Sequence, residues 1–356
     1  MAQKDHLDQR EKGVAVSDIP TVREWFDFWF REHVAPGLKP KTLEWYRYLI
    51  GHYITPAIGD LVLNTVTGDH LIVLQNQLRR ELGVRTVARV HELLNRAFKK
   101  AAVTRKIPFN PMDAVERPRV PRSKQVAFTP PEVAAIRREI VGTRLELLYD
   151  LALLQGFRRG ELLGLLISEY DASKETILVS GQVQTIAGTT ARQGSPKSEA
   201  GKREVPLTPR QQELMRAHLA TLKAERDRLG MEWKEHFLLF PSERGTPMIP
   251  RNLYRHYQDM LVRAGVVAST AAAPKEAGIS GPKRTKPIPT GASIPLHRMR
   301  HTAATRLNTV KVTPNVRQAI MGHGPGDVGE GYIHPEISEL RTALIDAEQE
   351  MLRWAA

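Results

Sequence analysis

The sequence contains no cysteine among its 356 residues. That absence excludes disulfides, thiolate metal sites and a cysteine nucleophile, and it fits a reducing compartment. The chain also lacks an apolar run long enough to span a bilayer, and the polar start "MAQKDHLDQREKG" is unlike a secretory signal peptide. Together these absences predict a cytoplasmic protein without a membrane partner.

Acidic residues are scarce relative to basic ones. The chain has 39 Asp and Glu against 52 Lys and Arg, a formal net charge of +13. Such a surplus favours a polyanionic partner, because binding releases counterions and the charge steers the encounter. We expect nucleic acid, with an ordinary basic surface as the alternative. The length exceeds what one core usually serves, so we expect two domains.

The N-terminal part of the chain has helical periodicity. Residues 1–19 are predicted to form a tail, and residues 20–116 carry four helical patterns that predict an all-α domain. The first pattern begins at a threonine cap, Thr21. The second is predicted to begin near Pro40 and to stop before Pro56, because proline interrupts a helix.

A stripe of basic side chains marks the fourth helical pattern, "VRTVARVHELLNRAFKKAAVTR". At 100° per residue its apolar side chains gather on one face and the stripe lies on the adjoining face. Residues 85–106 contain seven Lys or Arg and only one acid, Glu92. A solvated face is the alternative, but unbalanced cations favour contact with DNA phosphates. The predicted DNA-binding residues are Arg85, Arg89, Arg96 and Lys100.

A second domain follows a segment rich in proline and arginine. Residues 117–126 are the predicted linker, residues 127–335 the second domain and residues 336–356 a C-terminal helix. Helical patterns surround three short strand patterns, "ETILVS", "QVQTIAG" and "REVPLTP". Residues 266–293 lack periodicity and predict a long loop. The predicted fold is therefore α+β and mainly helical, an all-α domain followed by a mixed α/β domain with a small antiparallel sheet.

Four short segments of the second domain hold polar residues that could carry chemistry. They are "GFRRGELLGL", "GSPKSEAGKREVPL", "LHRMRH" and "MGHGPGDVGEGYIHP". Taken singly, each residue is more often structural: an arginine forms a salt bridge and a histidine is a satisfied polar group. The candidates are Arg158, Arg159, Glu161, Lys197, His297, Arg300, His301, His323 and Tyr332.

Common alternatives fit these segments poorly. His297 and His301 have the spacing of metal ligands on a helix, but two arginines stand between them and the glutamate of a zinc protease helix is missing. The glycines of residues 322–329 follow no strand pattern and precede no Gly-Lys-Ser/Thr, which argues against a nucleotide loop. No nucleophile elbow of a serine hydrolase is present. We predict neither a metal nor a cofactor.

As a set, the candidates suit phosphoryl transfer without a metal. Arginine forks match the nonbridging oxygens of a phosphate, and histidine can exchange a proton near neutral pH. A lysine can protonate a leaving oxygen. A tyrosine, whose ordinary pKa is about 10, can attack phosphorus and form a covalent phosphotyrosine once its proton is removed.

The same segments resemble the sequence boxes of the tyrosine recombinases, the phage integrase family. "GFRRGELLGL" resembles the first arginine box, "LHRMRHTAATRL" the His-x-x-Arg-His-Thr box, and "MGHGPGDVGEGYIH" the closing Gly-His box with a tyrosine nine residues later. The boxes occur in the family's order, and the resemblance covers about residues 20–345. It implies that the helical domain is a core-binding domain and the second domain is catalytic.

The resemblance assigns roles to the first half of the site. It implies that Arg158 is the first catalytic arginine, because it lies three residues before Glu161, a structural support. Arg159 receives no role. Lys197 matches the lysine of the family's β-turn, and Lys202 is its rival because this box is the least specific.

The resemblance assigns the rest of the site to the later boxes. His297 and Arg300 match His-x-x-Arg, His323 matches the second histidine, and Tyr332 is the implied nucleophile. The implied reaction is site-specific recombination through a 3′-phosphotyrosine, which needs neither ATP nor a metal. The alternatives are a DNA-relaxing enzyme like a type IB topoisomerase and a DNA-binding protein without activity.

The resemblance also implies partners and surroundings. They are double-stranded DNA, a homotetramer on that DNA, and an accessory DNA-bending or directionality protein in a bacterial cell that carries a phage or mobile element. Two features depart from the family pattern, "GPGDVGEG" after the Gly-His pair and the length of the loop at residues 266–293. From the 19 residues ahead of residue 20, we expect the arm-binding domain that many integrases carry to be either absent or reduced to a tail.

The predicted C-terminal helix has one apolar stripe. Its members recur at intervals of three and four residues, which places them on one helix face. Such a stripe must be buried, either on its own catalytic domain or on a neighbouring subunit. We expect the second arrangement, which the family's cyclic assemblies imply. The stripe consists of Ile337, Leu340, Leu344, Ala347, Met351 and Trp354.

Overall fold

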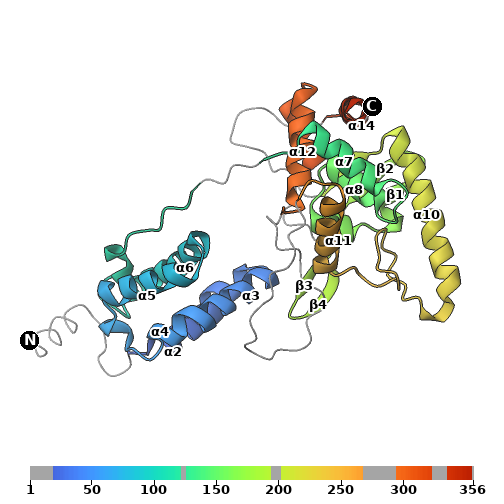
Figure 1. The fold of residues 1–356 in the computed structure, drawn as a ribbon. Coiled ribbons are helices and arrows are strands. Elements are labelled where there is room, and N and C mark those ends of the chain that lie inside the picture. The colour runs from blue at the N-terminus through green and yellow to red at the C-terminus, as the bar shows by residue number, and fades with distance from the viewer. Residues whose placement is uncertain (1–18, 122–125, 194–201, 268–293, 323–334, 355–356) are drawn as a thin grey trace, which may run out of the picture. The chain divides into compact units, whose positions relative to one another are not determined.

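A computed structural model describes residues 19–121, 126–193, 202–267, 294–322 and 335–354 (Figure 1). The chain divides into two compact units, Met1–Ser123 and Lys124–Ala356. Within the described residues, no helix combines the length and the apolar character that crossing a bilayer requires.

Every regular element described in the first unit is helical. Thr21 caps the first helix as predicted: its hydroxyl accepts a hydrogen bond from the Glu24 amide at 3.2 Å, and the Glu24 carboxylate accepts one from the Thr21 amide at 2.8 Å. The elements are α2 (Val22–Trp29), η1 (Phe30–Val34), η2 (Ala35–Gly37), α3 (Pro40–Leu49), η3 (Ile50–Ile54), α4 (Thr55–Ile58), η4 (Leu63–Thr65), α5 (Gly68–Glu81), α6 (Val84–Val103) and η5 (Pro111–Ala114).

The predicted stop before Pro56 is wrong. Helix α3 begins at Pro40, as predicted, but the chain continues through the π-helical turn η3 into α4, of which Pro56 is the second residue. Proline has no N–H group and is tolerated in the first turn of a helix, where that donor is not needed. The change from α to π spacing just before Pro56 lets the helical path restart there.

The core of the first unit is apolar and joins helices that are distant in sequence. Phe26 of α2 packs edge-to-face on Phe98 of α6 with ring centroids 6.1 Å apart. The indole N–H of Trp25 donates to the Ala97 carbonyl at 3.1 Å, so the one polar atom of this large side chain is satisfied. The buried face of α6 is the apolar face that the periodicity predicts.

The second unit combines helices with two small antiparallel sheets, which confirms the predicted fold class. One sheet has the order β1-β2-β5 and the other is the hairpin β3-β4. The strands are β1 (Tyr170–Asp171), β2 (Thr176–Val179), β3 (Gln182–Ile186), β4 (Thr189–Gln193) and β5 (Arg203–Pro206). The helices are α7 (Pro130–Ile140), α8 (Glu146–Leu154), α9 (Arg159–Gly164), η6 (Ile167–Glu169), α10 (Pro209–Leu229), η8 (Gly230–Glu232), α11 (Pro250–Arg263), α12 (His297–Thr309), α13 (Pro314–Met321) and α14 (Ile337–Arg353).

The core of this unit forms around helix α8, whose residues from Leu147 to Leu154 are all buried. Helix α12 packs against α8 and α14 (Figure 1). Helix α14 also packs against α13 and β5. The apolar stripe of α14 joins this core, with Leu340, Leu344 and Met351 at most 3% exposed. The expected docking of the stripe on a neighbouring subunit is therefore wrong for this structure, because its own unit already supplies the apolar surface that covers it.

Candidate active site

The structure describes three of the six predicted catalytic residues, Arg158, His297 and Arg300. Lys197, His323 and Tyr332 lie outside the described residues. Lys202, the rival lysine, is described as an exposed residue just before β5, and Gly322, the residue before His323, is also described.

Arg158 is the N-cap residue of α9. Its amide donates to one Glu161 carboxylate oxygen at 2.9 Å, and its guanidinium donates to the other at 2.6 Å. The same guanidinium donates to the Gly322 carbonyl at 3.0 Å, across 164 positions of sequence. One turn of helix therefore fixes the arginine, and the end of α13 orients it. Glu161 has the supporting position that the sequence predicts.

Arg300 lies on α12 and is 3% exposed. One guanidinium nitrogen, Nη1, donates to the Gly156 carbonyl at 2.6 Å. The other, Nη2, is buried and has no hydrogen-bond partner within the described part of the chain. Burying a charged donor without a partner is unfavourable, and such sites usually serve a function. An anionic oxygen would satisfy this nitrogen.

The site is electropositive. Burial, together with the positive charge of Arg158, lowers the pKa of Arg300 to about 9. Burial also opposes ionisation of Glu161, but the charges and hydrogen bonds of Arg203 and Arg158 outweigh it and hold the pKa of Glu161 below its ordinary value. Glu161 is thus a permanent anion that offsets only part of the surrounding positive charge.

His297 is the first residue of α12 and lies beside this charge. Its ring meets the His301 ring edge-to-face, with centroids 4.6 Å apart. Burial lowers the pKa of His297, and the charges of His301, Arg300 and Arg158 lower it further. A histidine with a lowered pKa is neutral at pH 7, so it can accept a proton. Among the described residues, no group of three His, Asp or Glu is arranged to hold a metal ion.

Arg203 belongs to the site and was missed from the sequence. This first residue of β5 is 9% exposed, and its guanidinium donates to Glu161 at 3.0 Å and to the Ile320 carbonyl at 2.8 Å. A usable signal existed in "KREVPL". Arg203 and Val205 are two positions apart on a strand, so they share a face, and Val205 is apolar. An arginine on the inward face of a strand needs an anionic partner.

The basic stripe of the first unit lies mostly on the surface, where Arg85, Arg89 and Arg96 are exposed and Lys100 is half-buried. Arg89 pairs with Glu92 at 2.9 Å. Arg96 donates to the Tyr46 hydroxyl at 3.1 Å and lies over that ring, which joins the stripe to helix α3. The predicted stripe is thus a real surface feature, and its contact with DNA stays a prediction.

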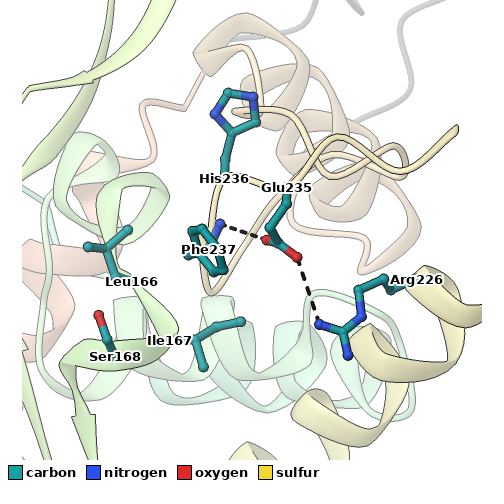
Figure 2. A pocket seen from close by; sticks show the side chains of 7 residues that line it. All are labelled: Leu166, Ile167, Ser168, Arg226, Glu235, His236 and Phe237. Carbon is teal, nitrogen blue, oxygen red and sulfur yellow. Dashed lines mark hydrogen bonds and ion pairs between the residues drawn. The ribbon is translucent and has the colours of Figure 1, made fainter. Parts of the chain in front are cut away.

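A cavity of about 510 Å³ lies apart from these residues (Figure 2). Glu235 accepts a hydrogen bond from the Phe237 amide at 2.8 Å and pairs with Arg226 at 3.8 Å. None of the predicted site residues lines this cavity. Its lining consists of Leu166, Ile167, Ser168, Arg226, Glu235, His236 and Phe237.

Comparison with known proteins adds an independent finding. Residues 132–339 match the phage integrase family, and residues 21–79 match the N-terminal SAM-like domain of phage integrases. An integrase of Streptomyces ambofaciens is 26% identical over 277 residues, covering 77% of this chain and 71% of that protein. An integrase of Saccharopolyspora erythraea is 24% identical over 381 residues, covering 92% and 81%.

Two solved structures are similar in fold. The Tn1549 transposon integrase in complex with circular intermediate DNA has a TM-score of 0.64 and 21% identity, covering 86% of this chain and 92% of that chain. A lambda integrase tetramer bound to a Holliday junction has a TM-score of 0.56 and 18% identity, covering 95% and 81%. At these identities the likeness establishes the fold.

Proposed function

The chain belongs to the phage integrase family and is a tyrosine recombinase, and we propose that it recombines specific sites in double-stranded DNA with Tyr332 as the nucleophile. The observation that carries this assignment is that the charge of Arg158 acts on a buried Arg300 whose Nη2 has no hydrogen-bond partner among the described residues. Two fixed cations, one of which has an unsatisfied donor, suit a phosphodiester, whose nonbridging oxygens carry the charge.

The proposed cleavage step is balanced without ATP or a metal. The Tyr332 hydroxyl oxygen bonds to phosphorus while the bond from phosphorus to the 5′ oxygen breaks. The tyrosine proton passes to a base, and His297 is suited to this because burial and adjacent positive charges lower its pKa. Lys197 or Lys202 gives a proton to the 5′ oxygen. The energy of the broken bond is kept in the phosphotyrosine, so a 5′-hydroxyl of another strand can reverse the attack.

Arg158 and Arg300 stabilise the charge that develops on the phosphorus oxygens. Because both are held by backbone carbonyls and a carboxylate before DNA arrives, little reorganisation is needed during the reaction. His323 is proposed to hydrogen-bond the same phosphate. The basic stripe of α6 is proposed to contact the DNA backbone and to hold the duplex while the second unit cleaves it.

Strand exchange between two sites requires four active subunits, so we propose a homotetramer on DNA. A lambda integrase tetramer bound to a Holliday junction is one of the structural neighbours, which supports the proposal. An accessory DNA-bending or directionality protein is also proposed, as is action on a mobile element within a bacterial cell.

The nucleophile can be tested with a suicide duplex that carries a nick next to the cleavage position. The duplex would be selected from a random-sequence pool by covalent capture on the unaltered chain. Tyr332→Phe should form no covalent adduct while retaining DNA binding, and Tyr170→Phe, a tyrosine of strand β1 in the same unit, should react normally. An adduct that persists in Tyr332→Phe would exclude this tyrosine.

The two lysines can be separated with a modified leaving group. If the 5′ oxygen is replaced by sulfur, the leaving thiolate needs no proton, because a thiol has a pKa of about 8.5. Loss of the lysine that acts as the general acid should therefore slow cleavage of the oxygen substrate and leave cleavage of the sulfur substrate nearly unaffected. We expect this pattern for Lys197→Ala and not for Lys202→Ala; the opposite result would assign the role to Lys202.

A further inference from the structure

We infer that Arg203 is a positioning residue of the recombination reaction, holding Arg158 and the end of α13 in their reactive arrangement. The inference rests on the proposed function. Arg203 is 9% exposed, and its Nε and Nη2 already donate to protein acceptors, so we assign it a supporting role and no contact with DNA. Its role follows from what its guanidinium joins.

Arg203 links three segments that are far apart in sequence. Its Nη2 donates to Glu161, the carboxylate that also binds Arg158. Its Nε donates to the Ile320 carbonyl near the end of α13, across 117 positions of sequence. Because the two arginines bind different oxygens of Glu161 through their guanidinium groups, a shift of Arg203 would move the carboxylate and with it Arg158.

Gly322 adds a second constraint on the same guanidinium. This residue ends α13 in the left-handed region at φ +65°, and a Cβ built on it would lie 2.6 Å from Nη1 of Arg203. Only a hydrogen fits between them. The Gly322 carbonyl accepts a hydrogen bond from Arg158. The close approach of Arg203 to Gly322 therefore fixes the position of the carbonyl oxygen that orients Arg158.

The segment Gly156-Phe157-Arg158 completes the arrangement. The Gly156 carbonyl binds Arg300, and the Phe157 ring lies under the Arg203 guanidinium with 5.1 Å from its carbon to the ring centroid. Of these three consecutive residues, two contact Arg300 and Arg203, and the third is Arg158 itself. Arg203 is the member of the set that lies on β5.

An arginine is required at this position for geometric reasons. The planar guanidinium can stack on Phe157 while its separate N–H groups point to a carboxylate and a carbonyl. A lysine keeps the charge but offers one nitrogen and no plane. Arg203→Lys is therefore informative, because it separates the charge of the side chain from its geometry.

The experiment measures the rate of covalent adduct formation on the selected nicked duplex. We expect Arg203→Met and Arg203→Lys each to slow the reaction about 100-fold, which is typical when a catalytic group is displaced by about 1 Å. The matched control is Arg144→Met, since Arg144 pairs with Glu225 at 2.6 Å and donates to the Pro241 carbonyl at 3.0 Å, remote from these segments. The control should react within about threefold of the unaltered chain.

A neutral substrate separates positioning from general damage to the fold. A methylphosphonate at the cleavage position removes one charged oxygen and with it part of the need for Arg158. The deficit of Arg203→Met should shrink on that duplex, as should that of Arg158→Ala. In a double variant that combines Arg203→Met with Arg158→Ala, the two losses of rate should not multiply, because Arg203 acts through Arg158.

Several outcomes would overturn the inference. They are a normal rate for Arg203→Met, a deficit that is equal on charged and neutral duplexes, or losses that multiply with Arg158→Ala. If the Arg203 variants do not fold, Gly322→Ala provides a second test, because its methyl group presses on the same guanidinium and should give the same pattern. Failure of the unaltered chain to form any adduct would instead refute the proposed function.

Discussion

The two units of the chain treat charge in opposite ways. Among the described residues of the first unit, no Asp, Glu, Lys or Arg is buried, and the buried polar side chains are Gln75, His91 and Asn110. The second unit buries both acids and bases within its described residues. They are Arg137, Asp150, Glu161, Arg203, Arg300 and Glu348.

This difference in burial determines how the cations of each unit can act. Exposed cations such as Arg85 act on a charged partner through water, where salt screens them and their exact placement matters little. Buried cations such as Arg300 act at short range in a medium of low polarity, where each is strong but must be held in place. A unit that binds can therefore have a simple apolar core, whereas a unit that catalyses needs a core that also supports ions.

The largest expected effect comes from removing α14. Deleting residues 337–356 should unfold the second unit and leave the first folded, because Leu340, Leu344 and Met351 are buried in the second core. Losing their burial removes roughly 5–9 kcal/mol, at about 1.5–3 kcal/mol per side chain, against a typical total of about 5–15 kcal/mol.

Amide hydrogen exchange would measure the unfolding of the second unit. In the truncated chain, protection should disappear in α8 and α12 and be retained in α6. Protection that survives in α8 of the truncated chain would show that α14 is dispensable to its own unit, and docking on a neighbouring subunit would then regain support.

Arg300→Ala should have the next largest effect. It should lower the cleavage rate about 100- to 1,000-fold, or roughly 3–4 kcal/mol of barrier, as is typical of losing one stabilising donor. Duplex affinity should change little. The control is Arg298→Ala on the same helix, where Arg298 pairs with Glu132 at 3.3 Å. This control should reduce thermal stability and leave the rate per folded molecule unchanged.

The stripe variants should affect binding without affecting chemistry. Replacing Arg85 and Arg96 by alanine should reduce the slope of log affinity against log salt by about 0.9 for each DNA phosphate that the variant no longer neutralises. Lys223→Ala on α10 removes an exposed cation elsewhere and should leave the slope unchanged. An unaltered slope in both stripe variants would make the stripe a solvated face.

The smallest predicted effect concerns Glu348, a buried carboxylate of α14. Burial raises the pKa of Glu348 above its ordinary value, and the charge of Asp150 adds to this. Its protonated form is thus favoured by folding, so the stability it contributes is present at low pH and is lost as the pH rises through the folded-state pKa.

Glu348→Gln should therefore raise the stability of the second unit by roughly 1 kcal/mol at pH 7. The gain should vanish below about pH 4.3, where the carboxyl is protonated in both states. Thermal melts across this range would measure it, with Asp346→Asn, an exposed acid of the same helix, as the control. A gain that does not depend on pH would show that ionisation is not its source.

Local signals predicted the parts of the fold that depend on neighbouring residues. Thr21 and Glu24 form a capping box because each side chain accepts a hydrogen bond from the other residue's amide. The four-residue sequence "TVRE" is enough to predict this pattern. The apolar face of α6 follows from its periodicity. Arg158 and Glu161 are three residues apart, so one helical turn brings them together.

Contacts between distant segments were not predictable in this way. The partners of Arg203 are 42 and 117 positions away, and nothing in the local pattern identifies them. The passage of the helical path through Pro56 depends on the π turn η3, for which the sequence carries no simple signal. The stripe of α14 predicted burial but not the covering surface, because an apolar face is compatible with any apolar partner.

The place of α14 in the chain has a consequence for synthesis. Domains fold in order as a protein leaves the ribosome, and the first unit here has a complete core of its own. The second core lacks its last helix until residues 337–353 have been made, and this helix follows Tyr332. On the proposed assignment, a nascent chain would bind DNA before it could cleave it, because Tyr332 is made before α14, the helix that completes the second core.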